Sequence, residues 1–185
     1  MEQNALRKNM WEKAGKVGLV LGLISTTYMF ISQWSSSAQI SSALMMILNM
    51  VLWAGKFGGC IWIMMMAMKK FAAQDSKIEN NTVFRFGVAV ALLSALVFAA
   101  ASFANAAFIS ADLINEQMTA AMEQMAPMMD SNTANLMEAF MNKIPQITFF
   151  SNLFYCFIYG TILSFILSRN IPNKNPFAER TSDEW

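Results

Sequence analysis

Residues 86–109 read FGVAVALLSALVFAAASFANAAFI, a stretch that carries no charged side chain. A helix crosses the hydrocarbon core of a bilayer with about 20 apolar residues, so this stretch is long enough to span a membrane. Its apolar residues are continuous and lack the alternation of a barrel strand. In hydrocarbon, only a helix satisfies the backbone donors and acceptors of a single segment internally. The stretch therefore predicts a transmembrane helix.

Three more stretches, at about 17–34, 44–68 and 147–168, have the same continuous apolar character. Together with the span at 86–109 they predict an all-α protein, an integral membrane four-helix bundle whose residues 1–185 form a single membrane domain. The first stretch follows a basic segment, as a signal peptide would. Its apolar region exceeds the about 7–15 residues typical of signal peptides, so we expect it to remain as a span.

The overall composition disfavours several classes of protein. Hydrophobic residues make up 56% of the chain and charged residues 14%, whereas soluble domains average about 25% charged residues. The net charge of +1 provides no basic surface for nucleic acid. The chain has no histidine, the commonest general base, and its spans contain no cluster of carboxylates. We therefore do not expect an enzyme.

The basic residues indicate how the spans are oriented. They are concentrated before the first span, between the second and third, and after the fourth: Arg7, Lys8, Lys13, Lys16, Lys69, Lys70, Lys77, Arg85, Arg169, Lys174 and Arg180. The other side of the predicted bundle has Lys143 alone. Because basic residues stay on the cytoplasmic side, both termini are expected in the cytoplasm. Residues 170–185 contain two prolines and are expected to form a mobile cytoplasmic tail.

The connection at about 112–145 is the one large segment predicted on the outer side. Its apolar residues recur at helical spacing, and Pro127 interrupts them, so we expect an amphipathic helical hairpin on the membrane surface or on the outer mouth of the bundle. Its predicted interaction face, for lipid or a protein partner, consists of Met118, Met122, Met125, Met129, Met137, Phe140 and Met141. Thioether sulfur also suits Cu(I). However, the second span uses methionine equally freely as a hydrophobe, so we predict no metal and no cofactor.

Lys56 is the most unusual residue of the sequence, because it lies near the middle of the second apolar stretch. A lysine at the centre of a transmembrane helix costs roughly 2.5–3.5 kcal/mol on insertion scales. It indicates either a site for an anion, a proton or a lipid headgroup, or a lysine that faces the bundle interior or snorkels outward. Asn49 lies on the same helical face, Asn105 lies in the third span, and Asp112 is the nearest acidic residue. These four residues form the predicted polar or ligand site.

Small residues recur at four-residue spacing in every span, for example Gly18 with Gly22 and Gly55 with Gly59. Such stripes let helix backbones approach closely in lipid. They serve either packing within one bundle, which we expect, or a homo-oligomer. The two cysteines, Cys60 and Cys156, lie in separate apolar stretches and are expected to behave as inert hydrophobes.

Several local features carry a resemblance to a known family. They are Lys69-Lys70, TVFRFG at 82–87, EQM at 116–118 and again at 123–125, and YGTILS at 159–164. In these features, and in the order of its parts, the chain resembles the bacterial family known only as the domain of unknown function numbered four-one-nine-nine. The resemblance implies four spans and the inner (cytoplasmic) membrane of a bacterium, and it implies no activity or catalytic residue.

The sequence thus predicts a non-enzymatic, multi-pass membrane protein that acts through lipid or protein contacts of its outer amphipathic segment. Its expected partners are membrane lipid and, through the small-residue stripes or that segment, another protein or a second copy. The alternative function is a small transporter or channel that uses Lys56.

Overall fold

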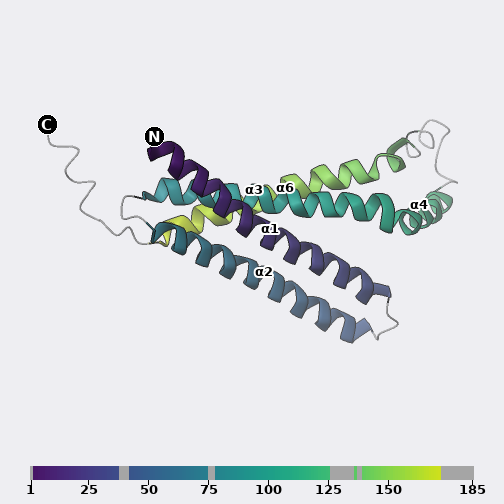
Figure 1. Ribbon diagram of the computed structural model, residues 1–185. Coiled ribbons are helices and arrows are strands. Elements are labelled where there is room, and N and C mark those ends of the chain that lie inside the picture. Colours follow the sequence, from purple (N-terminus) through teal and green to yellow (C-terminus); the bar gives the residue numbers. More distant parts are fainter. Residues whose placement is uncertain (1, 38–41, 75–77, 126–135, 137–138, 172–185) are drawn as a thin grey trace.

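The computed structural model describes residues 2–37, 42–74, 78–125, 136 and 139–171 (Figure 1). Their helices are α1 (Glu2–Ser37), α2 (Ser42–Ala72), α3 (Asn80–Ala104), the π-helical turn η1 (Asn105–Ile109), α4 (Ala111–Met125) and α6 (Ile144–Arg169). Four segments of these helices are long and apolar enough to cross a membrane: Lys8–Ser35, Met46–Ala72, Asn80–Ile109 and Ile144–Arg169. The predicted all-α class with four spans is confirmed, and each predicted span lies inside one of these helices.

The helices extend beyond the apolar stretches because their polar ends also favour helix. The start of α1 carries an exposed ion pair at helical spacing, between Lys16 Nζ and Glu12 Oε1 at 2.8 Å. Lys13 Nζ donates a hydrogen bond to Gln74 Oε1, just beyond α2. The basic start of the chain and the basic connection after α2 therefore lie at the same end of the bundle.

α3 is the central helix, packed most extensively on α6 and α1. The buried core lies mainly toward the end of the bundle where α2 finishes and α3 begins. There Phe71 of α2 stacks on Phe86 of α3, with ring centroids 4.4 Å apart. Met68 and Val90 are fully buried beside them. These side chains join α2 to α3 at this end.

Glycines let three of the helices pack closely. A Cβ atom added to Gly22 of α1 would lie 2.6 Å from Val97 of α3, and one added to Gly160 of α6 would lie 2.6 Å from Ala91. A Cβ atom added to Gly18 would lie 2.8 Å from Leu93 of α3, and one added to Gly87 of α3 would lie 2.8 Å from Ser164 of α6. Side chains do not approach to such distances, so these positions exclude anything larger than hydrogen. The small-residue stripes of α1, α3 and α6 thus serve packing within the chain.

The glycines of α2 are different, because Gly55, Gly58 and Gly59 have no atom within 4 Å of an added Cβ. α2 also packs less extensively on its neighbours than α1, α3 or α6 do. The small-residue stripe of α2 therefore contributes nothing to the packing of the described bundle.

The bundle consists of two helical hairpins, α1–α2 and α3–α6, which lie close together where α2 ends (Figure 1). Toward the other end α2 diverges from α3 and α6, whereas α1 keeps contact with the α3 side through Met29 with Ser102 and Gln33 with Ser110.

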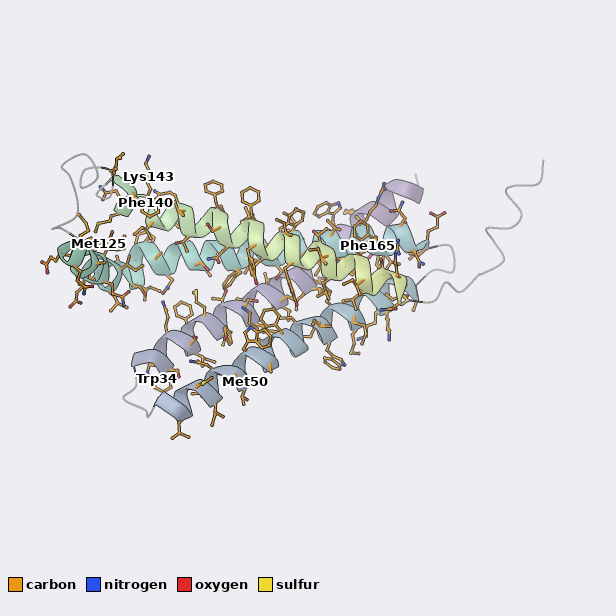
Figure 2. The ribbon with its side chains drawn as sticks, turned by 180° about the vertical axis from the view of Figure 1, so that it is seen from behind. Trp34, Met50, Met125, Phe140, Lys143 and Phe165 are labelled. Atoms are coloured by element: carbon orange, nitrogen blue, oxygen red, sulfur yellow. The ribbon has the colours of Figure 1, made fainter. Side chains whose placement is uncertain are left out.

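Figure 2 shows the side chains at the ends of the hairpins: Trp34 and Met50 at the end of one hairpin lie well away from Met125, Phe140 and Lys143 at the end of the other. Phe165 lies toward the end where the hairpins are close together.

Candidate functional site

Lys56 is half-buried, and aromatic rings from three helices surround its ammonium group. The Nζ atom lies 4.7 Å from the ring centroid of Tyr28 on α1, 5.3 Å from that of Phe98 on α3, and 5.7 Å from that of Phe57 on α2. A cation within about 6 Å of a ring face is attracted by the ring quadrupole. Among the described residues, Lys56 makes no ion pair with a carboxylate. The rings therefore stabilise the charge without neutralising it.

A cavity of about 100 Å³ lies beside Lys56 between the two hairpins. All four membrane helices contribute to it, and most of its lining is apolar. Lys56 is the sole charged residue among the described residues that line it. The other polar groups of the lining are hydroxyls and thiols: Ser25, Ser94, Tyr155, Tyr159, Cys60 and Cys156. Apolar walls with a few polar groups are typical of binding sites for organic molecules, and a cavity of this volume admits part of one rather than the whole.

The cavity is held open by aromatic contacts at its edge. The ring of Phe57 packs on Trp53 at 4.6 Å and meets the ring of Tyr159 edge to face at 5.5 Å. This chain of rings joins α2 to α6, two helices that otherwise touch little. It places a rigid wall next to the ammonium group of Lys56.

A second hollow borders Lys56 on the side of α1 and α2. It is an open groove of about 630 Å³, lined by Val20, Leu23, Ile24, Thr27, Tyr28, Ile31, Val51, Leu52, Gly55 and Lys56. All its side chains except those of Thr27, Tyr28 and Lys56 are purely apolar. Gly55 leaves the groove open, since no atom lies within 4 Å of its added Cβ. Lys56 thus lines two hollows at once.

The other three residues of the predicted polar site are not brought to Lys56. Asn49 and Asn105 line neither hollow as described. The Asn49 Oδ1 atom is buried without a hydrogen-bond partner in the described part of the chain. Asp112 is exposed in the first turn of α4, where a carboxylate favours the helix N-terminus.

Asn105 has a structural role instead. It begins the π-helical turn η1, in which the Ser110 N–H donates to the Asn105 carbonyl at 2.8 Å. The Ser110 hydroxyl also donates to Asn105 Oδ1, and Gln33 Nε2 of α1 donates to that hydroxyl, both at 3.3 Å. These bonds tie the end of α1 to the junction between α3 and α4. Buried amides that are satisfied in this way fix local structure.

The first half of the predicted outer hairpin is the helix α4. Its predicted apolar face is its less exposed one, because Met118 and Met122 are half-buried whereas Glu116 and Glu123 are exposed. Met125 is exposed at 48%, and no residue of α4 is buried. In the second half, Phe140 is exposed and Met141 half-buried. Met129 and Met137 lie outside the described residues, as does the predicted tail from residue 172 onward.

The helices and the hollows together define a multi-pass helical membrane protein with an intramembrane cavity. Residues 14–169 match the model of a family described as "Protein of unknown function (DUF4199)". This match covers most of the chain, so the protein belongs to that family, and the resemblance noted in the sequence is confirmed. No curated protein and no solved structure matches the chain.

Sequence reasoning missed most of the site around Lys56. Cys60 was within reach, because it lies one helical turn after Lys56 on the same face. Cys156, Tyr159 and Phe98 come from other helices, and no spacing rule relates them to α2. The aromatic residues of the site could not be recognised from the sequence, since each also fits an ordinary lipid-facing or core position.

Proposed function

We propose that the protein is a non-enzymatic membrane protein that binds the acidic head of an amphipathic molecule at Lys56, with part of the apolar body of that molecule in the cavity between the hairpins. One observation carries the proposal: a lysine within a transmembrane helix lies among aromatic rings at the edge of an apolar cavity, and none of the described residues that line that cavity is acidic. A cation at this depth is costly and is kept in proteins for a functional reason.

The shape of the cavity supports an elongated ligand with its acidic group at one end. Its lining on α2 runs from Lys56 to Met64, about 12 Å along the helix axis at about 1.5 Å per residue. Met64 is buried and Leu163 lines the same region, so the inner part of the cavity is apolar. A carboxylate or phosphate would meet the ammonium, and hydrocarbon would fill the rest. In this arrangement the ammonium group is paired with an anion, and the apolar walls contact hydrocarbon.

Replacement of Lys56 tests this proposal. In nanodiscs of phosphatidylcholine that contain a small fraction of oleate or lysophosphatidate, native mass spectrometry counts the acidic molecules retained per chain. We expect Lys56→Met to lower retention about tenfold or more, since hydrogen bonds between charged groups contribute about 1.5–3 kcal/mol. Lys56→Arg should keep most of it.

The matched control is Lys70→Met, which removes an exposed charge in the last turn of α2. It should leave retention unchanged. A second readout is the rate at which N-ethylmaleimide labels Cys60 and Cys156, which a ligand in the cavity should slow. Equal retention by the wild-type and Lys56→Met chains would contradict the proposal.

We also propose that α4 contacts the membrane surface, as a second contribution to lipid binding. The observation that favours it is the apolar face of Ile114, Met118 and Met122 on a helix that has no buried residue and whose Glu116 and Glu123 are exposed. In nanodiscs, Met122→Asp should speed amide hydrogen exchange of α4 and leave the spans unchanged, because a charge on this face opposes contact with hydrocarbon. Thr119→Asp adds the same charge at an exposed position and should have little effect. Equal exchange in the two variants would argue against membrane contact.

Transport is the other function that Lys56 would serve. It is ranked second because the described lining of the two hollows contains no other charged side chain to form a path. We further propose the bacterial inner membrane as the location, with both termini in the cytoplasm. The concentration of basic residues at one end of the bundle supports this orientation.

A further inference from the structure

The depth of Lys56 limits the charge that a ligand can bring to it. Within the span Met46–Ala72, Lys56 is about 15 Å from the first residue and about 24 Å from the last, at about 1.5 Å per residue. The hydrocarbon core of a bilayer is about 30 Å thick, so Lys56 lies well inside it. Among the described residues that line the two hollows, no other is charged. The described site therefore offers a single positive charge to a ligand.

We infer that the acidic head of the ligand is a carboxyl group, so that the ligand is a monocarboxylic acid whose first carbon atoms enter the cavity. The inference rests on the proposed function, because it assumes that an acidic head binds at Lys56. An ionised carboxylate carries one negative charge, which one ammonium group balances. A phosphate monoester carries about −1.5 to −2 charges at pH 7 and would leave up to one of them unpaired inside the membrane. An unpaired charge in an apolar medium is very unfavourable.

A carboxylic acid can also reach this depth without a charge. In an apolar medium an isolated carboxylate takes up a proton rather than stay ionised. The neutral acid can therefore pass the apolar lining of the hollows, which a phosphate group would have to pass as an ion. The complex of ammonium and carboxylate is neutral overall, as this depth requires.

The other polar groups around Lys56 suit a carboxylate better than a phosphate. Neutral hydroxyls from three helices line the cavity: Ser25, Ser94, Tyr155 and Tyr159. Each can donate a hydrogen bond to a carboxylate oxygen. Phosphate sites commonly use arginine forks or the free N–H groups of a helix N-terminus. The described lining contains no arginine and lies within the bodies of its helices, where backbone N–H groups bond internally.

The volume of the cavity limits how much of the acid it holds. The cavity measures about 100 Å³, and a water molecule, which is similar in size to a methylene group, takes about 30 Å³ in the liquid. About three or four carbon atoms after the carboxyl group therefore fit, and a longer chain leaves through the mouth. Short acids from water and fatty acids from the membrane share this chemistry.

The experiment compares oleate, oleyl phosphate and oleyl alcohol, which have the same chain and differ in the head group. Each is supplied at the same small fraction in phosphatidylcholine nanodiscs at pH 7, and native mass spectrometry counts the molecules that the wild-type chain retains. We expect oleate to be retained about tenfold or more over either of the others, since only its head matches the single charge of Lys56. Lys56→Met should remove this preference.

A water-soluble acid identifies the source of the ligand. Hexanoate is tested by the rate at which N-ethylmaleimide labels Cys60 and Cys156, both of which line the cavity. Slower labelling with hexanoate supports an acid that arrives from water. Slower labelling with oleate alone supports an acid that arrives from the membrane. Either result supports a carboxyl head.

Cys60→Leu tests whether the first carbon atoms occupy the cavity. It fills part of the cavity and leaves the charge of Lys56 in place, so it should lower retention of oleate about threefold or more. The matched control is Ala54→Leu, which adds the same side chain to α2 at an exposed position that lines neither hollow. It should retain oleate as the wild-type chain does.

The outcomes separate this inference from the proposed function. Oleyl phosphate retained as well as oleate, with both lowered by Lys56→Met, overturns the carboxyl head and leaves the proposed function standing. Equal retention of oleate by the Cys60→Leu and Ala54→Leu chains overturns the placement of the first carbon atoms in the cavity. Retention of oleate that Lys56→Met does not change overturns the proposed function and this inference together.

Discussion

Gly160→Leu is expected to produce the largest loss of stability of any single substitution in the membrane helices. An added Cβ at this position lies 2.6 Å from the Cβ of Ala91 and 3.3 Å from its Cα, so the backbones of α3 and α6 must move apart. These two helices form the most extensive contact of the bundle. Overpacking of a tight contact costs about 1–3 kcal/mol or more. Thermal unfolding in a fixed detergent, followed by circular dichroism, measures the change.

The same substitution at Gly58 provides the comparison. Gly58→Leu places an equal volume on an exposed position of α2 with nothing within 4 Å, so the unfolding temperature should stay the same or rise slightly. A similar loss at both positions would show that leucine is harmful for reasons other than packing. No loss at Gly160 would mean that α3 and α6 are less closely packed than described.

Lys56→Met is expected to leave stability unchanged or raise it, while it lowers retention of the acidic ligand about tenfold or more. A lysine at the centre of a transmembrane helix costs roughly 2.5–3.5 kcal/mol on insertion scales. The rings of Tyr28, Phe57 and Phe98 offset part of that cost, at about 0.5–1 kcal/mol for each exposed cation–π contact. The net gain on replacement by methionine is therefore about 0–2 kcal/mol. Unfolding in ligand-free detergent measures it.

Lys70→Met is again the control, since Lys70 is exposed at the end of α2 and should change stability little. Residues kept for binding are often suboptimal for stability, so opposite effects on stability and on ligand retention would identify Lys56 as such a residue. A marked loss of stability in Lys56→Met would instead identify Lys56 as a structural element that joins α1, α2 and α3.

The four spans could be predicted from the sequence because the bilayer imposes them on each segment separately. The stretch 86–109 is apolar throughout, and a single helix in hydrocarbon satisfies its own backbone. The amphipathic character of α4 could also be predicted, because the spacing of Met118 and Met122 in the sequence defines one face of a helix. The unusual position of Lys56 could also be recognised from the sequence. The free-energy cost of placing a charged side chain in a membrane follows from the apolar residues on both sides of it in the chain.

The function of each stripe and cavity residue depended on the tertiary structure. Gly18 and Gly22 have the same spacing as Gly55 and Gly59, yet the first pair packs against α3 and the second faces open space. The difference comes from the surface that a neighbouring helix presents and the angle at which it crosses, which no local pattern encodes. In the same way, Cys60 and Cys156 line one cavity because the packing of the two hairpins brings α2 and α6 to it. Hydropathy fixes which segments enter the membrane, and side-chain packing between helices decides what they enclose.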